Sequence, residues 1–159
     1  MPPDEGNPQG DSPAAPQSIP EVIPPTLSHR SPAISISVLP FLTEDPSVEV
    51  TAVVDTGFEG FILIPMSVGI MCNMNLWGVS GSTLADGRQV TNITAFGNVK
   101  FAGKVNPGIF VLSVADAAPL VGMEFIRAFG MDLVVSPGEA KSYFKDTASG
   151  TTIEAPPRV

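Results

Sequence analysis

Apolar and polar residues alternate along much of the chain from residue 33 onward, a period typical of half-buried β-strands. Ile34, Ile36 and Val38 alternate with serines, and the same pattern returns after a polar turn. A short, fully apolar run at residues 61–64 indicates a buried strand, and residues 109–114 form another apolar strand. The strands expected from these patterns cover residues 34–38, 48–54, 61–64, 76–84, 88–101 with a break near Gly97 and Asn98, 109–114, 132–135, 142–145 and 151–154.

Helical patterns are confined to two short segments. Pro65 suits the first position of a helix, because that position leaves its N–H unbonded and proline has none, so we expect a helix near residues 66–73. A second helix is expected at residues 123–129, where Phe125 and Phe129 fall on one face. With two short helices among so many strands, the fold class is mainly β.

Proline content divides the chain into a tail and a domain. Residues 1–32 hold 9 of the 17 prolines and few large apolar residues, too few to offset the entropy of ordering. We expect residues 1–32 to be a disordered proline-rich tail, residues 33–155 to form one domain, and residues 156–159 to be a short C-terminal tail. Within the tail, residues 19–25 leave a docking or processing role open.

Composition limits the possible partners. Sixteen acidic against eight basic residues give a net charge of −8, which argues against nucleic acid or an anionic membrane as a partner. One cysteine, Cys72, allows no internal disulfide, and with one histidine the chain offers no metal-ligand cluster, so we expect no metal or cofactor. The first residues lack an apolar signal core, and the uncharged run 60–85 is broken by proline, asparagine and glycine. We therefore expect a cytoplasmic protein without a membrane span.

The triplet Asp55-Thr56-Gly57 is the candidate catalytic motif. Alone it is weak evidence, because an ordinary Asx turn after a strand has the same sequence. Its context strengthens it. Val53 and Val54 lead into it as the end of a buried strand, and Asp86-Gly87 predicts a two-residue hairpin turn further along. Leu120-Val121-Gly122 then follows, 65 residues after Asp55, and precedes the second helix.

This order of elements resembles that of the retropepsin-like aspartic proteases, and of their bacterial single-domain members in particular. The resemblance covers about residues 33–155 and is carried mainly by residues 54–65, 84–87 and 120–123. It implies a retropepsin-like closed β-barrel half, with the hairpin at Asp86-Gly87 as a flap over the substrate.

The resemblance also implies an aspartic endopeptidase in which two carboxylates share one proton and activate a water molecule. The chain offers one suitable aspartate, since Asp146-Thr147-Ala148 lacks the glycine, so the second carboxylate must come from Asp55 of a symmetry mate. The expected partners are a second copy and a peptide or protein substrate. Besides catalytic Asp55, the implied supporting or substrate-binding residues are Thr56, Gly57, Phe58, Glu59, Ala85, Asp86, Gly87, Leu120, Val121 and Gly122.

Some positions depart from the viral pattern or have two interpretations. Phe58 replaces a small residue and would either narrow the neighbouring subsites or turn away from them. Glu59 is either a substrate contact or a solvated loop charge, and Leu120 and Val121 are either substrate contacts or core residues. Met123-Glu124 replaces an arginine and its successor, which puts the ion pair of the viral dimers in doubt. The alternatives to an enzyme are a non-catalytic binding or assembly module with the protease fold, and an unrelated small β-barrel.

Overall fold

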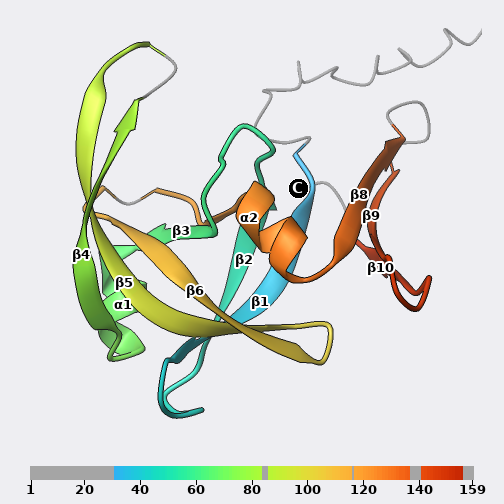
Figure 1. Ribbon diagram of the computed structural model, residues 1–159, viewed down its shortest axis with the longest axis horizontal. Coiled ribbons are helices and arrows are strands. Elements are labelled where there is room, and N and C mark those ends of the chain that lie inside the picture. The colour runs from blue at the N-terminus through green and yellow to red at the C-terminus, as the bar shows by residue number, and fades with distance from the viewer. Residues whose placement is uncertain (1–30, 84–85, 116, 137–140, 156–159) are drawn as a thin grey trace, which may run out of the picture.

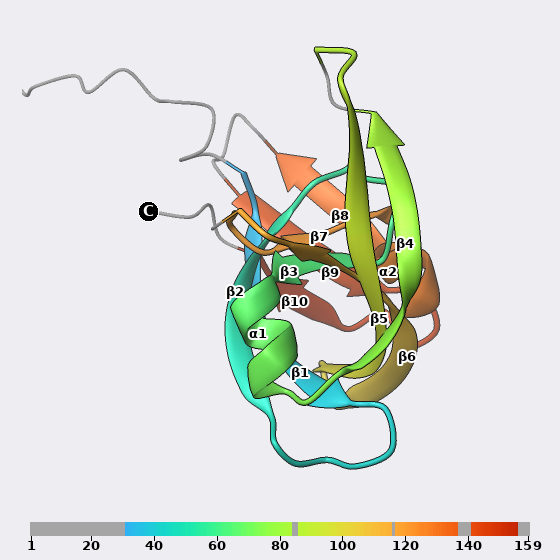
Figure 2. The same ribbon diagram turned by 90° about the vertical axis from the view of Figure 1, so that its left-hand side faces the viewer.

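A computed structural model describes residues 31–83, 86–115, 117–136 and 141–155 of the chain. Figure 1 and Figure 2 show a β-barrel with two short helices beside it and a small second sheet. The expected tails, apart from residues 31 and 32, lie outside the described residues. The elements are β1 (Ala33–Pro40), β2 (Val48–Val54), β3 (Ile62–Pro65), α1 (Met66–Met71), β4 (Asn75–Thr83), β5 (Gln89–Phe101), β6 (Lys104–Ser113), β7 (Leu120–Val121), α2 (Met123–Ala128), β8 (Met131–Ser136), β9 (Lys141–Asp146) and β10 (Thr152–Glu154).

The larger sheet closes on itself. Its strand order is β1-β2-β7-β3-β6-β5-β4, and β1 also pairs with β5. Six strands therefore close into a barrel, and β4 pairs with β5 outside this ring. The expected mainly β fold with a closed barrel and two short helices is confirmed. The second sheet, β10-β9-β8, is built from the chain that follows α2. Within the described residues, neither helix is long and apolar enough to cross a membrane.

Two strand predictions were wrong. β5 runs unbroken through Gly97, where a Cβ atom would lie 2.9 Å from the carbonyl oxygen of Leu39 and closer still to Met74. This glycine therefore serves the close approach of β1 to β5 and does not end a strand. β6 begins at Lys104, five residues before the expected start at 109, because the tight turn at Ala102-Gly103 has positive φ at both positions and returns the chain at once.

The hairpin at Asp86-Gly87 is present, but its turn is longer than expected. Thr83 pairs with Gln89, so Arg88 belongs to the connection and the predicted two-residue turn is wrong. The Asp86 carboxylate accepts hydrogen bonds from the backbone N–H of Arg88 at 3.0 Å and from its Nε at 2.6 Å. These bonds, the backbone one first, hold the pKa of Asp86 below its usual value. They draw Arg88 into the turn, and Gly87 takes the positive φ of 83°.

The core is rich in phenylalanine, and one ring joins its parts. Phe101, at the end of β5, lies 5.5 Å and 5.7 Å from the ring centroids of Phe125 and Phe129 on α2. It also lies 5.9 Å from Phe144 on β9. Such contacts contribute about 1 kcal/mol per pair beyond area burial. The barrel, α2 and the second sheet are therefore packed as one unit.

Cys72 is a buried thiol. It directly follows α1, is fully buried, and its Sγ lies 3.4 Å from the carbonyl oxygen of Val38. Burial raises the pKa of this thiol, which keeps it protonated and unreactive.

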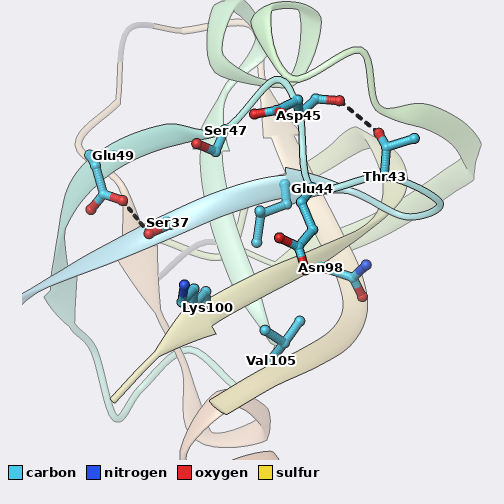
Figure 3. A pocket seen from close by; sticks show the side chains of 10 residues that line it. Ser37, Thr43, Glu44, Asp45, Ser47, Glu49, Asn98, Lys100 and Val105 are labelled. Atoms are coloured by element: carbon cyan, nitrogen blue, oxygen red, sulfur yellow. Dashed lines mark hydrogen bonds between the residues drawn. The ribbon is translucent and has the colours of Figure 1, made fainter. Parts of the chain in front are cut away.

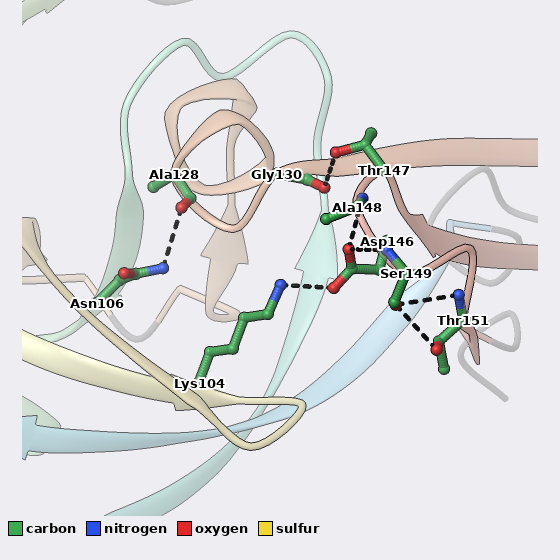
Figure 4. A network of polar contacts seen from close by, with 9 residues as sticks. All are labelled: Lys104, Asn106, Ala128, Gly130, Asp146, Thr147, Ala148, Ser149 and Thr151. Carbon is green, nitrogen blue, oxygen red and sulfur yellow. Dashed lines mark hydrogen bonds and ion pairs between the residues drawn. The ribbon is translucent and has the colours of Figure 1, made fainter.

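A polar network fastens the second sheet to the β5–β6 hairpin (Figure 4). Lys104 Nζ lies 2.5 Å from Asp146 Oδ2, while Asp146 Oδ1 accepts hydrogen bonds from the backbone N–H groups of Ala148 at 2.9 Å and Ser149 at 3.1 Å. The Lys104 bond first, and these backbone bonds after it, lower the pKa of Asp146 to about 2. This carboxylate is committed to a turn and an ion pair, as expected for an aspartate outside the active site.

We predict that Asp146→Asn lowers the melting temperature at neutral pH by a few degrees. Because the folded-state pKa lies below the unfolded value of about 3.9, the stabilisation is complete above about pH 5 and is lost as pH falls toward 2. The gap between wild type and variant, followed by circular dichroism, should close over this range. Asp132→Asn, at an exposed position of β8, is the control and should leave stability unchanged. A gap that stays constant from pH 7 to pH 2 would contradict this account.

Candidate active site

Asp55 stands at the end of β2, where three strands meet. The two-residue strand β7 lies between β2, to which it is parallel, and β3, to which it is antiparallel. The loop of residues 55–61 therefore leaves β2 on one side of β7 and returns as β3 on the other. The backbone N–H of Asp55 donates to the carbonyl oxygen of Val121 at 3.0 Å, which fixes the start of this loop.

The far side of the loop is held by backbone bonds as well. Gly122 N–H donates to Phe61 O at 3.0 Å, and Met123 N–H donates to Phe58 O at 2.8 Å. A Cβ atom at Gly122 would lie 2.2 Å from Gly60 O and 2.3 Å from Phe58 O. Since these are backbone oxygens, no rotamer change could make room, and the buried position 122 requires glycine.

The carboxylate of Asp55 is oriented by its own turn. Gly57 N–H donates to Asp55 Oδ1 at 2.9 Å, and Phe58 N–H donates to Asp55 O at 3.1 Å. This is an Asx turn, the arrangement that the triplet alone would predict. The turn leaves Asp55 half-buried and Thr56 exposed, so the carboxylate is fixed in direction and still open to a reactant.

A shallow cavity of about 470 Å³ contains this carboxylate. Of the predicted site residues, Asp55, Thr56 and Leu120 line it, together with Val53 and Val54. Four further lining residues were not foreseen: Ser31, Pro32, Leu133 and Val135. Leu133 and Val135 are two residues apart and therefore share one face of β8. Only the tertiary fold brings β8 beside β2. Pro32 is held there because its carbonyl oxygen accepts a hydrogen bond from Val54 N–H at 2.7 Å.

The other predicted site residues that the structure describes do not line this cavity. Val121 is fully buried, so its side chain belongs to the core. Phe58 turns back on its own loop: a Cβ atom at Gly60 would lie 2.5 Å from Phe58 Cζ, and one at Gly122 would lie 2.7 Å from its Cδ1. Phe58 does not line the cavity. Of its two interpretations, the geometry supports turning away.

Glu59 is exposed on the loop that follows Asp55. Its Oε2 lies 3.5 Å from Nη2 of Arg127 on α2, and both side chains are well exposed, so the pair contributes little to stability.

The β4–β5 ribbon projects beyond the barrel at the end where the loop from β2 to β3 lies (Figure 1, Figure 2). Asp86 and Gly87 near its tip are exposed, and neither lines the cavity around Asp55. Ala85 lies outside the described residues. The described residues at the tip of this ribbon therefore do not line the cavity around Asp55.

A second depression, lined by residues of the β1–β2 hairpin and of β5 and β6, is strongly polar (Figure 3). Glu49 accepts a hydrogen bond from Ser37, and Thr43 Oγ1 donates to Asp45 O at 2.7 Å, so several polar groups satisfy one another. Among the described residues no group of three histidine, cysteine or acidic side chains is placed to hold a metal ion.

Comparison with solved structures finds a likeness to the EIAV protease complexed with the inhibitor HBY-793. The match has a TM-score of 0.53 at 14% sequence identity and covers 66% of this chain and 93% of the other. The chain has a retropepsin-like fold. No protein-family model and no curated protein sequence matches it. The likeness to the retropepsin fold therefore lies in the order and pairing of the strands, since the sequence comparisons find no match.

We predict that Gly122→Ala destabilises the protein by at least about 1–3 kcal/mol, because the added methyl group overlaps two backbone oxygens that cannot rotate away. Urea unfolding would measure the loss. The matched control is Gly81→Ala on exposed β4, where a Cβ atom meets nothing within 4 Å. Equal stability of the two variants would show that the loop can move away from β7 at no cost.

Proposed function

We propose that the chain is a homodimeric aspartic endopeptidase that hydrolyses peptide bonds with a water molecule activated by two Asp55 carboxylates, one from each chain. The observation that carries this proposal is the half-buried Asp55 carboxylate, fixed by backbone bonds at the end of β2 within a retropepsin-like fold. In such a pair one carboxylate takes a proton from water and the other donates one to the substrate carbonyl oxygen.

The need for a second copy follows from what the cavity contains. Asp55 is the single acidic residue among the described residues that line it. Asp146 cannot serve, because Lys104 and two backbone N–H groups already engage its carboxylate. Two carboxylates about 3 Å apart share one proton, and a two-fold axis beside Asp55 would supply that geometry.

The surface beside Asp55 suits such an axis. Leu120, Leu133 and Val135 give the cavity an apolar wall, and Val135 is 49% exposed. Thr56 is exposed next to the carboxylate and would bond across the axis to hold the two loops in register. Burying this wall against its own copy would remove apolar area from water, at about 25 cal/mol per Å².

The remaining roles concern the substrate. Gly57 is exposed and would accept a hydrogen bond from the substrate backbone through its carbonyl oxygen. Ala85, Asp86 and Gly87 would close over the bound peptide and exclude water, with Gly87 giving the turn its freedom. The closing contacts would form only with substrate present.

We expect Asp55→Asn to reduce peptide cleavage by at least about 10²–10⁴-fold, because an amide cannot exchange protons with the attacking water. The fold should survive, since asparagine can still accept the Gly57 hydrogen bond. A peptide-library cleavage assay with sedimentation on the same samples would measure both effects, and Asp132→Asn is the exposed-aspartate control. A wild-type dimer that cleaves no library peptide between acid and neutral pH would instead indicate a non-catalytic module.

We also expect the dimer to be tighter at pH 5 than at pH 8 at fixed salt. Each chain carries a net charge of −8, and protonation at lower pH reduces the repulsion between the two copies. Sedimentation equilibrium at both pH values would give the dissociation constants. Repetition in about 1 M salt, where the Debye length falls to about 3 Å, should abolish the difference. Tighter association at pH 8 would exclude charge repulsion as the main pH-dependent term.

A further inference from the structure

Three aromatic rings form a row on the outer surface, which we call the aromatic row: Phe41, Phe96 and Trp77. The Phe96 ring lies between the other two, 4.4 Å from the centroid of Phe41 and 5.6 Å from that of Trp77. Phe41 is 40% exposed and Trp77 is 67% exposed. Phe41 follows β1 and Asp55 follows β2, and these strands are antiparallel, so the row lies at the opposite end of the β1–β2 pair from the active site.

Specific features of the backbone hold the row in place. Trp77 is the extra residue of a β-bulge, since Leu76 pairs with Ala95 and Gly78 pairs with the next residue, Thr94. A bulge of this kind re-aims a side chain.

The Asn98 side chain holds the other end of the row. Its amide donates to the carbonyl oxygens of Pro40 at 3.1 Å and Phe41 at 2.9 Å, which fixes Phe41 where β1 passes β5. Figure 3 shows this asparagine below the loop that follows β1. The bulge at Trp77 and the Asn98 hydrogen bonds therefore hold both ends of the aromatic row in place.

The chemistry of the row selects its ligand. Exposed tryptophan and phenylalanine side chains held side by side are typical of binding surfaces, and aromatic rows accept proline-rich segments, whose rings pack on the aromatic faces. The three members of the row carry no charge, so a charged ligand would gain no ion pair from them. An uncharged proline-rich peptide fits best.

The chain itself carries such a segment. Residues 12–20 contain no charged side chain and include Pro13-Ala14-Ala15-Pro16, the PxxP spacing of ligands for aromatic grooves. The ten residues 21–30 separate this segment from Ser31 and reach about 35 Å when extended. A domain of this size has a radius of gyration of about 14 Å, so the segment can reach any face.

Covalent attachment favours this segment over a proline-rich segment of another protein. A tethered ligand has an effective concentration in the millimolar range, which fills a weak site before a free protein at micromolar concentration can. We infer that the aromatic row binds residues 12–20 of its own chain. This interaction does not depend on catalysis and stands whether or not Asp55 is active.

Trp77 is the single tryptophan of the chain and reports on the row directly. In the full-length protein, Pro13→Ala/Pro16→Ala should raise the acrylamide quenching constant of Trp77 about two-fold, because a docked peptide covers one face of the ring. Pro2→Ala/Pro3→Ala removes the same number of prolines outside the segment and should quench like wild type. Adding a synthetic peptide of residues 10–25 at millimolar concentration should restore protection to the first variant.

Two results would overturn the inference. Equal quenching of wild type and Pro13→Ala/Pro16→Ala would show that the segment does not cover Trp77. Protection that increases with protein concentration would show that a second chain supplies the segment. Protection that is independent of concentration, lost in the first variant and kept in the second, supports the inference.

Discussion

The two-residue strand β7 is inserted between β2 and β3, and the rest of the site depends on this insertion. β7 pairs in parallel with the strand that ends at Asp55 and antiparallel with the strand that follows the loop. The loop of residues 55–61 must therefore pass around the end of β7, and it does so in van der Waals contact with Gly122. Because the contact is made by carbonyl oxygens that would lie 2.2 and 2.3 Å from a Cβ atom there, any side chain at residue 122 destabilises the insertion.

This arrangement positions the carboxylate with backbone groups. Asp55 is held through Val121 O and Gly57 N–H, and the return of the loop is held through Gly122 N–H and Met123 N–H. Side chains lining the cavity can vary without moving the carboxylate, whereas its direction depends on the barrel. α2 starts directly after Gly122, and its phenylalanines pack against Phe101. The loop of residues 55–61 and the core are thus packed as one unit.

Residue patterns predict the elements that depend on local periodicity. Alternation located β1 and β2, and the spacing of Asp55 and Leu120 led to the retropepsin-like fold. Two predictions failed at turns, where Gly103 starts β6 early and Arg88 lengthens the connection from β4 to β5. Others failed because they depend on contacts between distant strands. Gly97 has the sequence signal of a break, yet it marks the approach of β1 to β5. Leu133 and Val135 show only an ordinary strand, because nothing local indicates that β8 lies beside Asp55. A glycine can end a strand or allow two strands to approach closely, and only the packing around it shows which of the two applies.

The two proposals concern different apolar surfaces of the described residues, and the positions of these surfaces make the proposed partners compatible. Under the proposed function the wall beside Asp55 would take a second copy, because an identical chain would supply another Asp55 across a two-fold axis. The aromatic row needs no symmetry, and it lies at the opposite end of the β1–β2 pair. The N-terminal segment leaves the domain at Ser31, on the rim of the Asp55 cavity, where a free chain would crowd an incoming copy. Binding of residues 12–20 to the aromatic row would draw that segment away from the cavity, so that filling one surface keeps the other open.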